Sequence, residues 1–280
     1  MKKIVIPTDF SDNALDALTY AIQLFEDIPC TFYILNTYYT GASRMSNAMR
    51  RGRDSPRYHF LIEESENGLK KISTYLKTHL LNDKHTYKML SKSAEFIPYL
   101  KHIVAVENID LIVMGTTGAT GAKEIFMGSN AVKVIKHIDF CPILSVPKTH
   151  KYQELEKVVF STDYKKSFNA MELNCLIELQ LLNNFMLKVI HIKREKKLDL
   201  FQEQNKRVLQ QIFDSNLILF EEIDTNTTVE VAINTYVKKQ DVNMICLLNY
   251  EHSFMEKLLH EPIIKRISFH SLKPLLIIPV

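Results

Sequence analysis

The sequence is poor in glycine, contains no tryptophan and has no long apolar run. Its 280 residues include seven glycines, and Gly128 is the last of them. No apolar run approaches the ~18 residues that a membrane-spanning helix needs. The amino-terminal apolar run is also too short for a signal peptide, because Asp9 follows it at once. We therefore expect a cytoplasmic protein without a membrane segment.

Paired cysteines and a strong charge of one sign are missing too. The four cysteines form no C-x-x-C pair and are far apart, which is typical of buried, reduced thiols and argues against a zinc site. The formal net charge of +3 is too small to indicate nucleic-acid binding. The histidines are scattered, and neither H-E-x-x-H nor G-x-S-x-G occurs. We therefore expect no metal site and no catalytic residue.

The sequence does contain a repeat of one unit. Residues 3–11 (KIVIPTDFS) and 157–165 (KVVFSTDYK) both end a β-branched run in Thr-Asp-aromatic, at an offset of 154 (163 − 9). Near the two ends, residues 141–147 (CPILSVP) match 273–279 (KPLLIIP). A period this long predicts two tandem domains. We expect them at 1–148 and 154–280, and the second lacks a counterpart of the segment 38–58.

Each copy alternates strand patterns with helix patterns, and Ser11 is the expected N-cap of the first helix. Continuous apolar strands that alternate with helices predict an α/β fold with a parallel, doubly wound sheet covered on both faces. The expected strands of the first copy are 3–7, 31–36, 86–91, 110–115 and 143–147. The expected helices are 12–27, 59–81, 94–107 and 123–137.

A glycine cluster follows the fourth predicted strand. Within residues 114–130 (MGTTGATGAKEIFMGSN), Gly115, Gly118, Gly128 and Ser129 form the pattern G-x2-G-x9-G-S. Glycines between a buried strand and a helix favour backbone N–H groups held open for an anion, and the alternative is a ligand-free loop with positive φ. Neither a Walker A motif nor G-x-G-x-x-G is present. Because four positions match at a fixed spacing, we favour nucleotide binding.

Asp9 follows the first predicted strand. In a 3-2-1-4-5 strand order the first and fourth strands are neighbours at the point where the order reverses, and ligands bind there in such sheets. Asp9 and the glycine cluster would then face one crevice. Its carboxylate could accept hydrogen bonds from a ribose hydroxyl or an adenine amine, and the alternative is a cap on the first helix shared with Ser11. Asp163 has the same place in the second copy, so a structural role must explain part of the aspartate's presence.

These motifs resemble the universal stress protein family over essentially the whole chain, as a tandem of two such domains. The resemblance rests on residues 6–11, 114–130 and 141–147, and G-x2-G-x9-G-S is that family's ATP-binding signature. It implies five strands of order 3-2-1-4-5 in each domain, an adenine nucleotide α-hydrolase-like fold, and ATP with Mg²⁺ as the ligand. The nucleotide-binding residues that it implies are Pro7, Thr8 and Asp9 toward adenine and ribose, Thr37 just after the second strand in the adenine pocket, Met114, Gly115 and Gly118 beside ribose and phosphates, and Gly128, Ser129 and Asn130 at the phosphate tail.

The second copy departs from this pattern. Residues 128–130 (GSN) become 260–262 (HEP), and Gly115 aligns near Leu248. Glu261 would place negative charge where phosphate should lie, and Pro262 removes an N–H donor. We therefore expect one ATP site per chain.

The second domain is expected to act as the partner that family members otherwise gain by dimerising. In this pseudo-dimer the final strand, 275–280, would pair with 143–147. The chain could in addition form a homodimer, and the sequence does not identify its protein partners. The segment 38–58 is either a lid over the nucleotide or a disordered loop.

The leading hypothesis is a cytoplasmic stress-response protein that binds ATP in its first domain as a regulatory or interaction module. Any ATP hydrolysis would be slow, because no catalytic base is evident. One alternative is a ligand-free scaffold whose two crevices are vestigial. Another is an enzyme related to the adenine nucleotide α-hydrolases, which nothing in the sequence favours.

Overall fold

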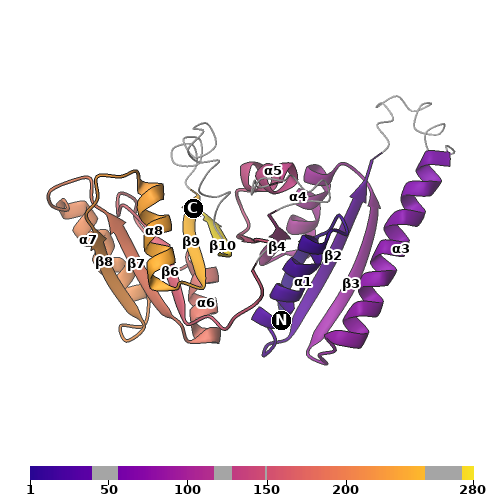
Figure 1. Ribbon diagram of the computed structural model, residues 1–280, viewed down its shortest axis with the longest axis horizontal. Helices are drawn as coiled ribbons and strands as arrows, with labels where there is room; N and C mark the ends of the chain where they lie inside the picture. The colour runs from indigo at the N-terminus through magenta and orange to yellow at the C-terminus, as the bar shows by residue number, and fades with distance from the viewer. Residues whose placement is uncertain (40–55, 117–127, 149, 250–272) are drawn as a thin grey trace.

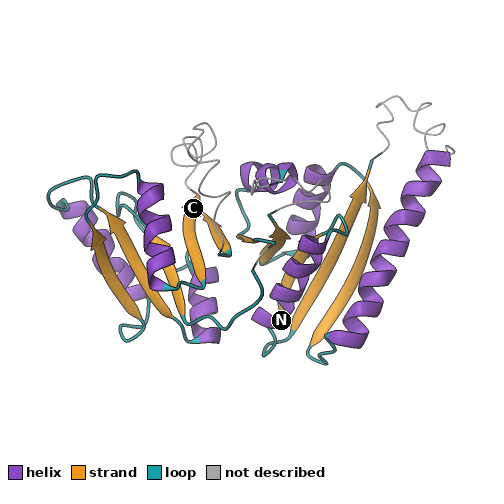
Figure 2. Ribbon diagram, in the orientation of Figure 1, coloured by secondary structure: helices purple, strands orange, loops and turns teal. Residues whose placement is uncertain are grey.

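A single ten-stranded sheet runs through the computed structural model, which describes residues 1–39, 56–116, 128–148, 150–249 and 273–280 (Figure 1). Its strands are β1 (Lys2–Pro7), β2 (Cys30–Tyr38), β3 (His85–Ser93), β4 (Leu111–Gly115), β5 (Ile143–Val146), β6 (Lys157–Ser161), β7 (Met186–Ile192), β8 (Ile218–Ile223), β9 (Met244–Asn249) and β10 (Leu275–Pro279). The helices around it (Figure 2) are α1 (Asp12–Leu24), α3 (Pro56–His79), α4 (Phe96–Glu107), α5 (Ser129–His137), α6 (Asn174–Asn183), α7 (Leu200–Ile212) and α8 (Val229–Gln240).

The strand order is β3-β2-β1-β4-β5-β10-β9-β6-β7-β8. The predicted order 3-2-1-4-5 is confirmed in the first half, and the second half repeats it. Neighbouring strands are parallel within each half, whereas β5 and β10 are antiparallel, with Leu276 opposite Leu144. The predicted pairing of the final strand with residues 143–147 is therefore confirmed. It joins the two expected sheets edge to edge into one.

The expected elements of the first copy are present, with bounds shifted by a few residues. Ser11 is the N-cap of α1, as predicted, and its hydroxyl accepts the N–H of Ala14. The helix expected at 123–137 begins at Ser129, because Gly128 is in an extended conformation (φ −59°, ψ 152°) and acts as its N-cap. Residues 123–127 lie outside the described part of the chain. Strand β2 is longer than expected, so Thr37 lies inside it and not after it.

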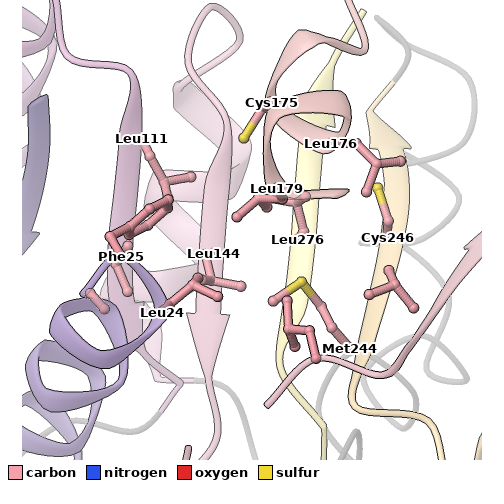
Figure 3. Packing of buried hydrophobic residues seen from close by; sticks show 14 of the residues in the cluster. Leu24, Phe25, Leu111, Leu144, Cys175, Leu176, Leu179, Met244, Cys246 and Leu276 are labelled. Atoms are coloured by element: carbon pink, nitrogen blue, oxygen red, sulfur yellow. The ribbon is translucent and has the colours of Figure 1, made fainter. Parts of the chain in front are cut away.

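Alternate side chains along the strands fill an apolar core on each face of the sheet. One core receives α1, α3, α6 and α7, and the other receives α4, α5 and α8. The first core continues across the junction of the halves, where Leu144 and Leu276 are both fully buried. Figure 3 shows side chains from β4, β5, β10 and β9 gathered with those of α6 along this face. The two halves therefore share one core.

Two expectations from composition can be compared with the structure. All four cysteines are buried and none is in a disulfide, as predicted. Burial raises the pKa of the Cys30 thiol to about 11 and of the Cys141 thiol to about 12, so both stay protonated at neutral pH. Among the residues that the structure describes, no helix has the length and apolarity to cross a membrane.

A polar network ties α7 to the ends of β6 and β7. His191, 1% exposed, places Nδ1 3.0 Å from the Thr162 carbonyl oxygen and Nε2 3.1 Å from Glu195 Oε1. Gln202 donates from Nε2 to Glu195 Oε1 at 2.8 Å and to the Asp163 carbonyl oxygen at 2.9 Å. The Glu195 carboxylate is therefore the acceptor at the centre of the network.

The shared core predicts that Leu276→Ala destabilises the protein. Removing a fully buried side chain at the junction leaves a cavity, and the free energy of unfolding should fall by about 2–5 kcal/mol. Urea denaturation measures it. Leu181, which is 78% exposed on α6, is the control, and Leu181→Ala should change stability by less than about 0.5 kcal/mol. Equal effects of the two substitutions would show that the junction is not a packed core.

The network around Glu195 predicts a pH-dependent stability. Burial opposes ionisation of Glu195, but the hydrogen bonds from Gln202 and the Arg194 N–H and the charge of His191 outweigh it and lower its pKa. Stability from a lowered pKa is present at neutral pH and is lost as the pH falls through the folded-state value. Glu195→Gln should therefore cost about 1–2 kcal/mol at pH 7 and progressively less toward pH 3.

Urea denaturation of wild type and Glu195→Gln between pH 7 and pH 3 tests this expectation. Glu154→Gln changes an exposed side chain and should alter stability by less than about 0.5 kcal/mol at pH 7. A cost of Glu195→Gln that is the same at pH 7 and pH 3 contradicts the assignment of the charge to the network.

Candidate functional site

A cavity of about 310 Å³ opens where β1, β2 and β4 end and α4 and α5 begin. This is the point at which the strand order reverses, and α4 and α5 lie on the same face of the sheet (Figure 1). Gly118 lies outside the described residues. The other nine residues that the sequence predicted all line the cavity: Pro7, Thr8, Asp9, Thr37, Met114, Gly115, Gly128, Ser129 and Asn130. The expectation that Asp9 and the glycine cluster face one crevice is confirmed for the described residues.

Hydrogen bonds shape the turn that leaves β1. Thr8 Oγ1 accepts the N–H of Phe10 at 3.0 Å, and Asp9 Oδ1 accepts the N–H of Ser11 at 3.1 Å. Phe10 has a φ of 63°, which is uncommon for a residue with a side chain. The turn therefore depends on both polar side chains, and it directs Thr8 and Asp9 to the cavity rim.

The same turn recurs after β6. Thr162 Oγ1 accepts the N–H of Tyr164, Asp163 Oδ1 accepts that of Lys165, and Tyr164 has a φ of 56°. The aspartate therefore has a structural role in both copies, but that role is the turn after the strand, and the cap of α1 is Ser11 alone. The presence of Asp9 alone does not distinguish a binding half from a non-binding one.

A glycine on α3 accommodates the unusual position of Phe10. A Cβ atom on Gly68 would lie 2.5 Å from atoms of the Phe10 ring, closer than van der Waals contact allows. Glycine inside a helix costs about 1 kcal/mol relative to alanine, so its presence here calls for a packing reason. The ring that follows Asp9 supplies that reason.

Gly115 has a structural role besides lining the cavity. A Cβ atom there would lie 2.6 Å from Asn13 Oδ1 and 2.8 Å from the Asn13 carbonyl oxygen, because the start of α1 crosses the end of β4. Asn13 is 2% exposed, and its Nδ2 donates to the Val146 carbonyl oxygen at 3.1 Å. Part of the glycine pattern thus comes from close helix–strand packing, which the sequence interpretation did not include.

The second copy lacks this close approach. With the offset of 154, Asp12 corresponds to position 166, but α6 begins eight residues later at Asn174. Leu248, which aligns with Gly115, is 4% exposed and packs in the core. Among the described residues no helix start is placed against Leu248 as α1 is against Gly115, so a leucine fits there.

The cavity lining of the first copy is also replaced. The strand register pairs Lys3 with Thr31 and Lys157 with Met186, so Thr37 corresponds to Ile192. Ile192 is 5% exposed and belongs to the core that receives α8. A polar residue that borders the cavity in the first half is therefore a buried apolar residue in the second.

The start of α5 forms a polar part of the cavity lining. Ser129 and Asn130 are exposed, and the first N–H groups of a helix have no acceptor within the helix. The N-cap Gly128 makes no side-chain capping bond, the first turn has no acidic residue, and Lys136 and His137 lie in the last turn. These N–H groups and the helix dipole favour an anion.

Part of the cavity lining is apolar. Leu35, Met114 and Ala131 are buried there, and Phe96, the first residue of α4, is half-buried at the wall. Asn36 also borders the cavity, and its Nδ2 donates to the Thr8 carbonyl oxygen at 2.7 Å.

The sequence did not predict the other six lining residues, which are Ala14, Leu35, Asn36, Phe96, Thr116 and Ala131. The available signal was their place beside predicted strand ends and helix starts, since those segments meet at one edge of a parallel sheet.

Comparisons with known proteins agree with this architecture. The model of the universal stress protein family matches residues 1–147. A universal stress protein of Methanocaldococcus jannaschii is 34% identical over 152 residues, which cover 54% of this chain and 84% of that protein.

Two solved structures match the whole fold. A universal stress protein from Archaeoglobus fulgidus has a TM-score of 0.65 at 15% identity and covers 99% of this chain and 95% of its own. The functionally unknown PA1789 from Pseudomonas aeruginosa has a TM-score of 0.61 at 11% identity, covering 99% and 92%. Identities this low show the fold alone. The family match and the related sequence go further, and the chain belongs to the universal stress protein family.

Proposed function

We propose that the first half of this universal stress protein binds ATP in the cavity between β1 and β4 and acts as a nucleotide-dependent regulatory or interaction module. The observation that carries the proposal is the cavity itself, whose lining combines an anion-favouring helix start with buried apolar side chains. Its volume of about 310 Å³ is within the range of small-molecule sites. A cytoplasmic location stays a prediction from the sequence.

Family membership supports a nucleotide as the ligand class. One universal stress protein has been solved in complex with cAMP, which is a property of that protein. Its TM-score to this chain is 0.35, so the proposal rests on the cavity and on the family.

Each part of the cavity lining suits one part of ATP. The N–H groups at the start of α5, with the Ser129 hydroxyl, would hold phosphate oxygens, and Asp9 would face the ribose hydroxyls. Leu35 and Met114 would contact the adenine ring. Gly115 keeps its part of the lining free of a side chain, which leaves room for the ribose.

Mg²⁺ would enter with the phosphates. Within the described part of the chain, no group of three His, Cys, Asp or Glu residues is placed to hold a metal ion. Mg²⁺ commonly binds through substrate phosphates, one or two carboxylates and water, so it does not need such a group. Asp9 is the ionisable side chain among the described lining residues.

We further propose one site per chain, with the binding domain at 1–148 and a non-binding domain at 154–280. Ile192 and Leu248 support it, because they bury apolar side chains where Thr37 and Gly115 border the first cavity. The segment 260–262, which carries Glu261, lies outside the described residues. The second domain would serve as a fixed structural partner through the β5–β10 pairing.

Slow turnover is part of the proposal. Asp9, the one carboxylate among the described lining residues, is assigned to the ribose hydroxyls in this proposal, which leaves no general base for the attack of water on a phosphate. Analysis of nucleotide products separates the readings: ADP with phosphate reports slow hydrolysis, and AMP with pyrophosphate reports an α-hydrolase-like enzyme.

Isothermal titration calorimetry of the full chain with Mg-ATP tests the proposal directly. The expected stoichiometry is one ATP per chain. Two sites per chain contradict the assignment of the second domain. No heat at low millimolar ATP supports instead the alternative of a ligand-free scaffold.

A charge at the start of α5 should block binding. Ser129→Glu introduces a carboxylate where phosphate would lie, and we expect ATP affinity to fall at least about tenfold because like charges repel in a partly enclosed site. Ser129→Gln is the matched control with a similar size and no charge, and it should lose only a few-fold. Both side chains are exposed at this position, and an acidic residue is compatible with a helix start, so the fold should be retained. Equal affinities of the two variants, measured by calorimetry, would place the phosphates elsewhere.

A further inference from the structure

Phe96 is an aromatic side chain at the cavity wall whose packing is incomplete. It is the first residue of α4, and it lies half-buried against the core that α4 and α5 share. The residue before it, Glu95, is the N-cap of α4 and makes no side-chain capping bond. The ring therefore has one side on the core and borders the cavity.

The neighbours of Phe96 define what the ring can contact. Leu35 and Met114 come from the ends of β2 and β4 on the same face of the sheet, and they are 1% and 5% exposed. The polar lining residues come from the turn after β1, the end of β2, the residue after β4 and the start of α5. Phe96 has no hydrogen-bonding group, so it cannot contribute to binding ribose or phosphate. Its partner has to be the flat, apolar part of the ligand.

We infer that Phe96 stacks on the nucleobase and makes the site selective for purines. This inference rests on the proposed function and identifies the residue that contacts the base and selects its type. Stacking of a base on an aromatic side chain is strong enough to change affinity about tenfold or more. Every base has a π-face, but a purine offers a larger one than a pyrimidine, so stacking favours ATP and GTP over CTP and UTP.

The second half supports this assignment by contrast. Helix α8 corresponds to α4, and its first residue is Val229, which is packed against the same core. The second half therefore has no aromatic ring at this position, and it is also the half that we propose not to bind a nucleotide.

Affinity measurements on variants test the inference. Phe96→Ala should weaken ATP binding about tenfold and bring the affinities for ATP and UTP within about threefold of each other. Phe96→Leu keeps an apolar side chain and should behave like Phe96→Ala toward the base while it retains wild-type thermal stability. Phe140, which is 50% exposed and does not line this cavity, is the control, and Phe140→Ala should bind ATP as wild type does.

A spectroscopic signal separates stacking from a purely structural role. The chain contains no tryptophan, so Phe96→Trp provides a single indole at the wall. Its emission should be quenched by ATP and unaffected by inorganic tripolyphosphate. Calorimetry on the same variant should show ATP affinity within about threefold of wild type.

The outcomes distinguish the two proposals. Wild-type ATP affinity in Phe96→Ala, or an unchanged Phe96→Trp emission while calorimetry reports ATP bound, overturns the inference and leaves the proposed function standing. An equal loss of ATP and tripolyphosphate binding in Phe96→Ala also overturns it, because the effect would then not involve the base. Wild-type protein that binds no ATP overturns both proposals.

Discussion

The antiparallel pairing of β5 with β10 is the constraint on which the rest of the structure depends. Parallel strands keep both halves buried on two faces, and an edge strand left open on each half would expose unpaired backbone groups beside apolar side chains. Pairing Leu275–Ile277 with Ile143–Ser145 removes both edges at once and continues one core from α1 to α6. The two remaining edges are β3 and β8, at the far ends of the sheet.

This junction also gives the second half a structural role. The final strand of the second half, β10, and its helix α6 supply buried contacts to the first half. The first half has glycines at Gly68 and Gly115, where Phe10 and Asn13 pack closely, whereas the positive φ of Phe10 recurs at Tyr164 in the second half. In the second half, Leu248 and Ile192 fill the corresponding places with apolar packing.

The cavity is connected to the junction through Asn13. Its side chain lies against Gly115 at the cavity floor and donates to the carbonyl oxygen of Val146, the last residue of β5. A buried asparagine that spans these two elements requires their relative positions to be maintained. Val146 follows Ser145, the last residue of β5 that pairs with β10, so Asn13 links the cavity lining to the end of the strand at the junction.

The sequence by itself determined the repeat and the alternation of strands with helices, because apolar runs and turn residues are local signals, whereas the strand order and the nine described lining residues as a set came from the resemblance to the universal stress protein family. Tandem Thr-Asp-aromatic motifs located two equivalent strand ends, and the glycine cluster indicated the one beside which the structure has a cavity. Only the tertiary structure decided why those residues are there. Asp9 shares a turn-forming role with Asp163, and Gly115 is required by the crossing of α1. Phe96 joined the cavity wall only in three dimensions, because no local pattern reports which helix start lies over which strand end.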